Sequence, residues 1–208
     1  MKQIKKISLV VCGLCLALTM GLFVKMQVKA YNVGDKFTYE KVEYEVTKTP
    51  TKNDKGTCKV IGAKDNAKVI QIYKTVYKNG EEVICNAIAD GAFEEHESLK
   101  YVKLSAASPI KAIPKNCFKD CETLATVAID TGSVTKIDKS AFSGCTKLRK
   151  FGINSKKLKK SSFKKNCFKG VTNLKIYAPT KSVAKKYGKY IKSYGGTAVK
   201  FYSYTIDD

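Results

Sequence analysis

The chain has 208 residues and a formal net charge of +21 at neutral pH, so we expect it to attract anionic partners over long range. Its basic residues are nearly all lysine, because Arg149 is the sole arginine. Reading of DNA base edges relies on bidentate arginine, so this composition argues against sequence-specific nucleic-acid binding. A charge-driven binder of nucleic acid, acidic glycans or cell-wall polymers stays open, as does an ordinary lysine-rich solvated surface.

Residues 1–30 have the pattern of a secretory signal peptide. A charged start with Lys2, Lys5 and Lys6 precedes a mainly apolar run over 7–24, and Ala30 offers a cleavage site before Tyr31. An uncleaved membrane anchor is the alternative, because the apolar run is close to spanning length. We favour cleavage, which leaves 178 residues for one domain. The leader holds five lysines and no acid, so the mature charge is +16.

Residues 31–85 predict a small antiparallel β unit. Alternating apolar residues over 37–39 and 42–46 flank a turn at Glu40-Lys41, and further short strands are expected over 57–61 and 69–73. Thr75 to Lys78 and Glu81 to Cys85 flank Asn79-Gly80, which is the strongest short hairpin signal.

Residues 86–179 contain four copies of one pattern. The copies centre on phenylalanines 25, 24 and 26 residues apart, each followed six residues later by a leucine; they are Phe93, Phe118, Phe142 and Phe168. A fixed period in this range predicts a leucine-rich repeat solenoid. We expect a turn or short helical stretch around each phenylalanine. A short strand should follow each leucine, and these strands should stack side by side as a parallel sheet about 4.8 Å apart.

The ends of the repeat array need caps, because a solenoid otherwise exposes an apolar edge. Residues 31–85 are predicted to cap one end. For the other end, residues 180–208 predict a short amphipathic helix over 182–191, a break at Gly195-Gly196 and a strand over 198–202. The fold class is therefore an α+β solenoid. It has a short repeat array with a parallel sheet, an antiparallel β cap and a helix–strand cap.

Six cysteines remain after cleavage, and an even count in a secreted chain suggests disulfides. The repeat gives another interpretation. Cys117 and Cys167 stand where other copies have alanine, and Cys121 and Cys145 stand where others have His96 or Val171. Small free cysteines pack well at such core positions. We therefore predict mostly free thiols, and specifically no bridge between Cys121 and Cys145, whose side chains should point the same way in stacked coils.

The copy Ile137-x3-Ala141-Phe142-x2-Cys145-x2-Leu148 resembles the repeat of the BspA-like leucine-rich repeat family. The resemblance covers residues 86–179, with departures at His96, Val171 and Phe163. It implies a secreted or surface bacterial protein whose repeats serve adhesion and protein binding, and it supplies no catalytic motif, cofactor or metal site.

Two further features of the first copy have ordinary explanations. His96 is expected to be a partly buried substitute for cysteine, although an enzyme using His96 is the rival hypothesis. Asp90, Glu94, Glu95 and Glu97 form an acidic cluster whose spacing matches no calcium loop, so we expect a solvated face. No Cys-x-x-Cys pair occurs in the sequence after residue 30, which argues against structural zinc.

The best candidate site is the exposed face of the predicted sheet. Strand residues that alternate with the core should lie on that face because the side-chain period is two; they are Tyr101, Lys103, Thr126, Ala128, Lys150, Gly152, Lys175 and Tyr177. Tyrosine beside lysine suits contact with a protein or glycan. We predict a secreted, non-catalytic and monomeric repeat protein that mediates protein binding or adhesion at a bacterial surface.

Overall fold

The computed structural model describes residues 31–203; the predicted signal peptide over 1–30 and the tail over 204–208 lie outside the described residues. In the N-terminal part, five strands pair in the order β1-β2-β3-β6-β5. Their bounds are Lys36–Tyr39 for β1, Val42–Lys48 for β2, Thr57–Ala63 for β3, Thr75–Lys78 for β5 and Glu81–Ile88 for β6.

Both predicted hairpin turns are confirmed. Strands β1 and β2 pair antiparallel around Glu40 and Lys41, whose φ angles are 45° and 69°. Strands β5 and β6 pair antiparallel around Asn79 and Gly80, whose φ angles are 49° and 88°. Two successive positive φ angles are the signature of a type I′ turn, whose twist matches that of the strands it joins.

The prediction of a wholly antiparallel unit over 31–85 is wrong at two places. Strand β3 pairs with β6 in parallel, and strand β4 (Val69–Ile72) leaves this sheet to pair in parallel with β7. Parallel strands need a crossover connection rather than a tight turn, and the segment that carries β4 supplies one between β3 and β6. The N-terminal unit is therefore joined to the repeat array by the β4 strand.

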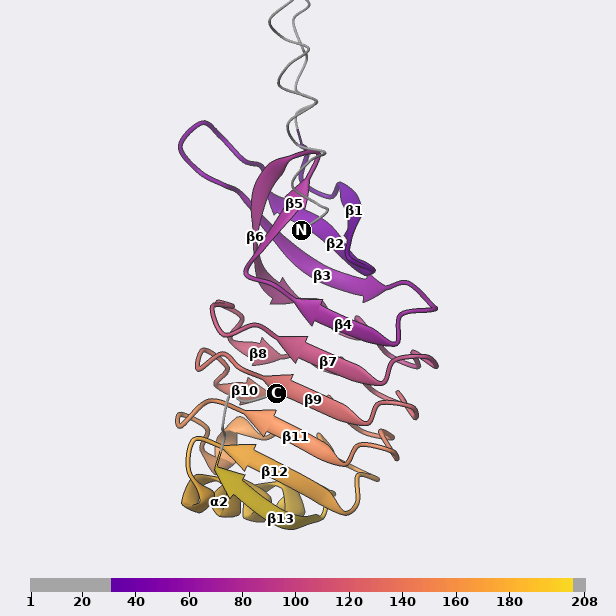
Figure 1. The fold of residues 1–208 in the computed structure, drawn as a ribbon, viewed down its shortest axis with the longest axis vertical. Coiled ribbons are helices and arrows are strands. Elements are labelled where there is room, and N and C mark those ends of the chain that lie inside the picture. Colours follow the sequence, from indigo (N-terminus) through magenta and orange to yellow (C-terminus); the bar gives the residue numbers. More distant parts are fainter. Residues whose placement is uncertain (1–30, 204–208) are drawn as a thin grey trace, which may run out of the picture. The chain divides into compact units, whose positions relative to one another are not determined.

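The predicted parallel sheet of the repeats is confirmed and is longer than expected. It has six strands in the order β13-β12-β11-β9-β7-β4, which lie side by side (Figure 1). The five strands after β4 are β7 (Tyr101–Leu104), β9 (Thr126–Ile129), β11 (Lys150–Ile153), β12 (Leu174–Ala178) and β13 (Ala198–Ser203). The sheet thus takes one strand from each predicted copy, one from the predicted N-terminal cap and one from the predicted C-terminal cap.

The opposite side of the coils carries the turns around the phenylalanines. Two positions in every coil have positive φ. The first holds Gly91, Asn116, Ser140 and Asn166, and the second holds Glu95, Asp120, Gly144 and Gly170. These residues recur at the repeat period, so each coil makes a turn of the same shape rather than a helix. Short parallel strands β8 (Ala112–Ile113) and β10 (Lys136–Ile137) and a 3-10 turn at Lys160–Ser162 complete the connections.

The core is a column of stacked aromatic rings inside the coils. Successive centroids of Phe93, Phe118, Phe142 and Phe168 are 5.0, 5.3 and 5.1 Å apart, with interplanar angles of 5°, 7° and 25°. The four rings are almost completely buried. Each of the two central rings, Phe118 and Phe142, therefore packs against a phenylalanine in the coil before it and another in the coil after it.

Helix α2 (Lys181–Ser193) covers the last coils at the C-terminal end of the array (Figure 1). Thr180 caps the N-terminus of the helix, because its side chain accepts a hydrogen bond from the Val183 backbone N–H at 3.2 Å. Ala184, Tyr187 and Ile191 form its buried face, and the Tyr187 hydroxyl donates to the Ser155 carbonyl at 2.5 Å. The predicted helix over 182–191 is confirmed and is slightly longer at both ends. Within residues 31–203, no helix is long and apolar enough to cross a membrane.

Candidate binding surface

The parallel sheet turns alternate residues inward and outward. The inward positions continue the core, as Val102, Val127, Phe151 and Ile176 show by their burial. The outward positions form two rows that cross the strands. We call these two rows together the outer sheet face.

The first row of the outer sheet face is set by the strand register. From β4 to β13 it consists of Val69, Tyr101, Thr126, Lys150, Lys175 and Lys200. Its character changes along the array, because the first three members are uncharged and the last three are lysines. Val69 is 60% exposed, so the uncharged end presents an apolar side chain to solvent.

The second row lies two residues further along each strand. It consists of Gln71, Lys103, Ala128, Gly152, Tyr177 and Tyr202. The Tyr177 and Tyr202 rings stack with centroids 4.8 Å apart and an interplanar angle of 14°. Burial, followed by the nearby Tyr202 hydroxyl, raises the pKa of Tyr177 above its ordinary value. Tyr177 is therefore neutral at physiological pH.

The structure therefore brings the predicted site residues together in the register expected. Tyr101, Thr126, Lys150 and Lys175 share the first row, and Lys103 and Tyr177 share the second. Two details differ from a uniformly exposed face. Gly152 is buried, and the Lys103 ammonium lies 3.3 Å from the carboxylate of the buried Asp130.

Sequence reasoning missed four members of the outer sheet face. Val69 and Gln71 were assigned to the N-terminal cap, and Lys200 and Tyr202 to the C-terminal cap. A signal for the second pair was present, because Lys200-Phe201-Tyr202 repeats Lys175-Ile176-Tyr177 after 25 residues. That interval equals the spacing of the central phenylalanines, and it places β13 in the array.

The three lysines of the first row are neighbours on adjacent strands. Lys150 is in register with Lys175, and Lys175 with Lys200. Like charges directly across a sheet destabilise it. None of these three ammonium groups forms an ion pair with a carboxylate within residues 31–203. This row is therefore a set of uncompensated charges that a bound anion would stabilise.

The N-terminal unit shows how the same chain pairs its lysines elsewhere. Glu45 and Lys59 are in register on β2 and β3, and their charged groups lie 2.9 Å apart. Lys64 lies 2.8 Å from Glu43, and Lys78 lies 3.0 Å from Asp35. The contrast has a simple origin, because residues 139–203 contain 18 Lys and Arg and no Asp or Glu.

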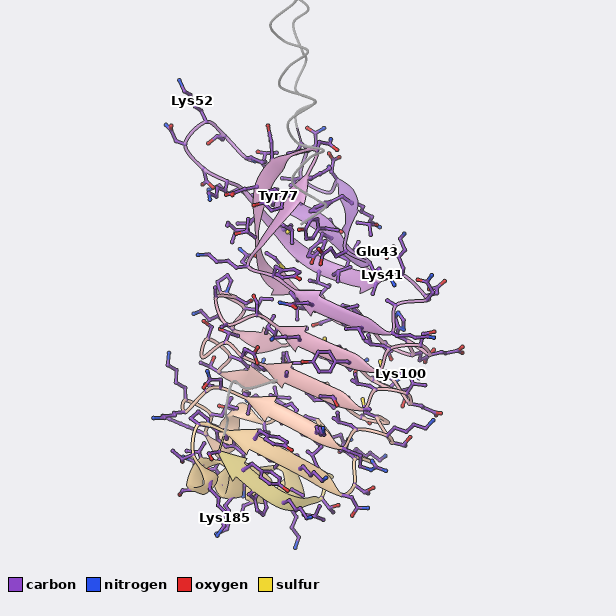
Figure 2. All side chains as sticks on the ribbon, viewed as in Figure 1. Lys41, Glu43, Lys52, Tyr77, Lys100 and Lys185 are labelled. Carbon is purple, nitrogen blue, oxygen red and sulfur yellow. The ribbon has the colours of Figure 1, made fainter. Side chains whose placement is uncertain are left out.

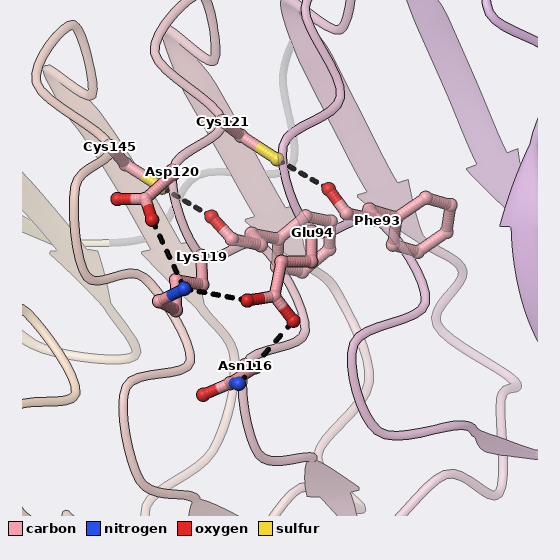
Figure 3. A network of polar contacts seen from close by, with 8 residues as sticks. Phe93, Glu94, Asn116, Lys119, Asp120, Cys121 and Cys145 are labelled. Atoms are coloured by element: carbon pink, nitrogen blue, oxygen red, sulfur yellow. Dashed lines mark hydrogen bonds and ion pairs between the residues drawn. The ribbon is translucent and has the colours of Figure 1, made fainter.

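The acidic cluster of the first copy takes part in contacts between coils (Figure 3). The Lys119 ammonium of the next coil lies 2.7 Å from the Glu94 carboxylate and 3.2 Å from the Asp120 carboxylate. The Asn116 amide donates to the other Glu94 oxygen at 3.4 Å. In the described part of the chain, no group of three or more potential ligands could hold a metal ion. Glu94 therefore joins two coils.

The cysteine position of the repeat also joins neighbouring coils (Figure 3). The Cys121 thiol donates to the Phe93 carbonyl at 2.7 Å, and the Cys145 thiol donates to the Phe118 carbonyl at 2.9 Å. His96 holds the same position, with Nε2 3.0 Å from the Lys64 carbonyl oxygen. The partly buried histidine thus also contacts a backbone carbonyl, as cysteine does in the next two coils, although Lys64 is not equivalent to Phe93 or Phe118. A catalytic role is not needed to account for it.

The six cysteines of residues 31–203 are all buried and unpaired in the structure. Because Cys121 and Cys145 each point towards the preceding coil's backbone, their thiols follow one another along the array instead of facing. Burial raises the pKa of the Cys121 thiol to about 12, and burial likewise raises the pKa of Cys145. Both groups are therefore protonated donors at neutral pH, as the hydrogen bonds require.

The model of the BspA type leucine rich repeat region matches residues 68–192 with six copies. This match covers more than half of the chain, so the chain belongs to the BspA-type leucine-rich repeat family. The model finds two copies more than the four predicted, and its range begins at β4, in agreement with the longer parallel sheet. No curated protein matches the chain.

Solved structures of leucine-rich repeat proteins share the fold. One from Bacteroides ovatus has 23% identity and a TM-score of 0.54, over 68% of this chain and 37% of that one. Another, from Bacteroides capillosus, has 19% identity and a TM-score of 0.53, over 69% of this chain and 97% of that one. The pneumococcal vaccine antigen PcpA has 15% identity and a TM-score of 0.50, over 84% of this chain and 49% of that one.

Proposed function

We propose that this protein is secreted or displayed at a bacterial surface and binds a protein or glycan partner through the outer sheet face, without catalysis and as a monomer. The observation that carries the proposal is the register of the sheet. It gathers Tyr101, Lys103, Lys150 and Tyr177 from three coils onto one surface. Membership of the BspA-type family supports a role in binding.

The outer sheet face is suited to binding because little conformational entropy is lost there when a partner docks. Its backbone is held by strand pairing on both sides from β7 to β12, and the Tyr177 and Tyr202 rings already stack on each other. Preorganised side chains cost less to order than those of a mobile loop. We further propose that the N-terminal unit and the α2 segment act as caps, so that the ligand meets the coils between them.

The test of the outer sheet face uses changes that leave the net charge unaltered. Tyr101→Ala combined with Tyr177→Ala should weaken binding to a partner captured from host mucus or bacterial wall fractions, since aromatic side chains dominate binding hot spots. Tyr77→Ala is the matched control, because Tyr77 is exposed on β5, outside the parallel sheet. Equal affinities of the unaltered protein, the double variant and the Tyr77→Ala control would contradict the proposal.

A second candidate function is charge-driven binding of an anionic polymer, such as a cell-wall polymer or an acidic glycan. The uncompensated row of Lys150, Lys175 and Lys200 favours it. Replacing these three lysines by glutamine should weaken binding of polyphosphate or a sulfated polysaccharide and flatten its dependence on salt. Glutamine at Lys147, Lys156 and Lys157 removes the same charge from exposed turns. If the two sets of glutamine substitutions weaken binding equally, the attraction comes from the charged surface as a whole. The row of three lysines is then not a specific binding site.

Secretion is tested at the N-terminus. The pattern over residues 1–30 predicts that protein recovered from the culture medium begins at Tyr31. A product in the medium or on the cell that retains the apolar run would instead support the membrane-anchor alternative.

A further inference from the structure

We propose that the end of the array formed by β13 and α2 is a second binding site, which takes an extended acidic segment of a partner protein as an added β-strand. This site uses the free edge of β13 and the side of that strand that faces α2, whereas the outer sheet face uses its opposite side. It does not depend on the function proposed for the outer sheet face. Four observations support the proposal: a free sheet edge, an apolar groove beside it, lysines along the groove and the absence of acids from residues 139–203.

The first observation is the edge of the parallel sheet. Strand β13 pairs with β12 on one side and has no strand on its other side within residues 31–203. An edge strand presents unpaired backbone N–H and C=O groups that another chain can pair with. Val199 on this strand is 51% exposed, so this part of the strand is open to solvent.

The second observation is a groove of about 380 Å³ between β13 and α2. Ala198 and Phe201 line it from β13, and Gly188 lines it from the helix. Phe201 is in register with the buried Ile176 yet is itself only partly buried. Its ring is the last in the row of inward-pointing side chains of the sheet. Part of this ring is therefore exposed in the groove.

The form of the groove depends on the glycine in the helix. A Cβ added at Gly188 would lie 2.4 Å from the Phe201 ring. Any side chain at this position would therefore push the ring away from the helix. Glycine lets the ring lie against α2, and the ring forms an apolar floor on which a partner side chain can pack.

The third observation is the charge along the rim. Lys185, Lys189 and Lys192 line the groove from α2, and Lys185 marks this end of the array in Figure 2. Their spacing of four and three residues puts them on one face of the helix. None of the three forms an ion pair within residues 31–203. Like charges at this spacing repel and destabilise the helix.

The fourth observation selects the occupant. Residues 139–203 contain no acid, so a second copy docking end to end would bring two sets of lysines together. A segment that carries acidic and apolar side chains on the same face satisfies all three features at once, because Phe201 and the lysines line the same groove. Its backbone pairs with β13, its apolar side chains pack on Phe201, and its carboxylates meet the lysines. Strand addition of this kind takes affinity from main-chain hydrogen bonds and specificity from side-chain pockets.

The probe is a fluorescein-labelled peptide with valine and glutamate on one face of the extended strand and threonine at the alternate positions. Its binding to the full-length protein is followed by fluorescence anisotropy. Lys185→Ala, Lys189→Ala and Lys192→Ala together should weaken binding about tenfold. The matched control replaces Lys147, Lys156 and Lys157, which removes the same charge from exposed turns of the basic half. It should leave affinity nearly unchanged. Thermal unfolding of both variants confirms that they are folded.

Two N-methylated peptides distinguish strand addition from attraction by charge. Methyl groups on alternate residues remove the N–H donors from one edge of an extended peptide, and shifting the pattern by one residue removes them from the other edge. Only one pattern should abolish binding, because only one edge of the peptide faces β13. Equal binding of both methylated peptides, or equal loss of affinity in both lysine triples, would overturn the proposal. So would a concentration-dependent dimer in sedimentation that the peptide does not dissociate.

Discussion

At the scale of single residues, the second and third copies make the same two contacts with the copy before them. The phenylalanine stacks on the phenylalanine before it, and the residue three positions later bonds to that preceding residue's backbone. Phe142 stacks on Phe118 while Cys145 donates to the Phe118 carbonyl. One coil therefore provides both the apolar and the polar surface on which the next coil is built.

The phenylalanine column predicts that losing one central ring affects three coils. Phe142 contacts Phe118, Phe151 and Phe168, so Phe142→Ala should lower the free energy of unfolding by about 3–5 kcal/mol. Urea denaturation measures the change. The exposed Lys147 is the control, and its replacement by alanine should cost less than about 0.5 kcal/mol. Similar losses in the two variants would refute the register of the repeats.

Asn154, which directly follows β11, is partly buried and would be a poor neutral control. Its amide donates to the Asp130 carbonyl in the preceding coil at 3.1 Å. We therefore expect Asn154→Ala to cost about 1 kcal/mol, the net contribution of one hydrogen bond.

Gly144 and Gly170 are equivalent turn positions that should respond differently to a methyl group. Both have positive φ, at 77° and 84°, so alanine carries a similar backbone penalty of roughly 1–2 kcal/mol at each. A Cβ at Gly144 would also lie 1.9 Å from an Asp120 carboxylate oxygen and 3.1 Å from the Asp120 Cα, whereas the nearest atom to one at Gly170 is 3.8 Å away. Gly144→Ala should therefore be the more destabilising by a further 1–3 kcal/mol or so.

The two alanine variants are compared by their urea midpoints under the same conditions. Equal destabilisation would mean that Asp120 moves aside without cost. That result would contradict the tight contact between the second and third coils.

The buried thiols predict a loss of stability at high pH. Burial raises the pKa of Cys121 from 9.0 to about 12, so its contribution is complete below pH 9.0. Above that value the unfolded chain releases the thiol proton first. The free energy of unfolding should then fall by about 1.4 kcal/mol per pH unit for this group, until the folded thiol ionises too.

Denaturation under reducing conditions between about pH 8 and pH 11 tests this behaviour. Cys121→Ala should make the decline with pH shallower by about 1.4 kcal/mol per unit. Leu124→Ala, which removes a buried apolar side chain from the same coil, should lower stability at every pH and leave the slope intact. An unchanged slope in Cys121→Ala would show that this thiol is not buried in the folded protein.

At the scale of elements, the predictions of strands, turns and helices from the sequence were most accurate where a short motif determines the backbone conformation. Asn79-Gly80 specifies a type I′ turn through its positive φ angles, and the apolar face of α2 follows from helical spacing. The spacing of Phe118 and Phe142 defines successive coils. In each of these cases the residues that determine the structure are close together in the chain.

The predictions from the sequence were less accurate where the pairing of strands depends on contacts between distant segments of the chain. Alternation in Val69–Ile72 identifies a strand but not the sheet it joins, because strands of either sheet alternate in the same way. The side of β3 on which β6 pairs is likewise decided by the crossover through β4. For the candidate site, the outer positions of β7 to β12 were predictable from the period of two. The lack of acids near Lys150 and Lys175 could also be read from the sequence, because residues 139–203 contain none.

At the scale of the whole described unit, charge is divided along the array. The ion pairs between side chains occur within residues 35–138, whereas the 18 basic residues over 139–203 have no acid among them. The first half therefore gains some stability from attraction, and the second half loses stability through repulsion. Both sites proposed above use this second half, so its repulsion is a cost that a bound anion would relieve.

The division of charge predicts opposite responses to salt in the two halves. At about 0.1 M salt the Debye length is near 10 Å, so adding salt weakens both the attraction between exposed ion pairs and the repulsion between unpaired lysines. Amide hydrogen exchange, followed at low and at moderate concentrations of sodium chloride, resolves the halves separately. Protection of β11, β12 and α2 should rise with salt as repulsion is screened. Protection of β2 and β3 should fall slightly, because the pair Lys59–Glu45 is screened.

The triple change of Lys150, Lys175 and Lys200 to glutamine supplies the internal control. It should raise the protection of β12 at low salt and remove most of the further rise in that protection as salt is added. A uniform response along the array, or no response of the variant, would show that repulsion among these lysines does not limit the stability of the C-terminal coils.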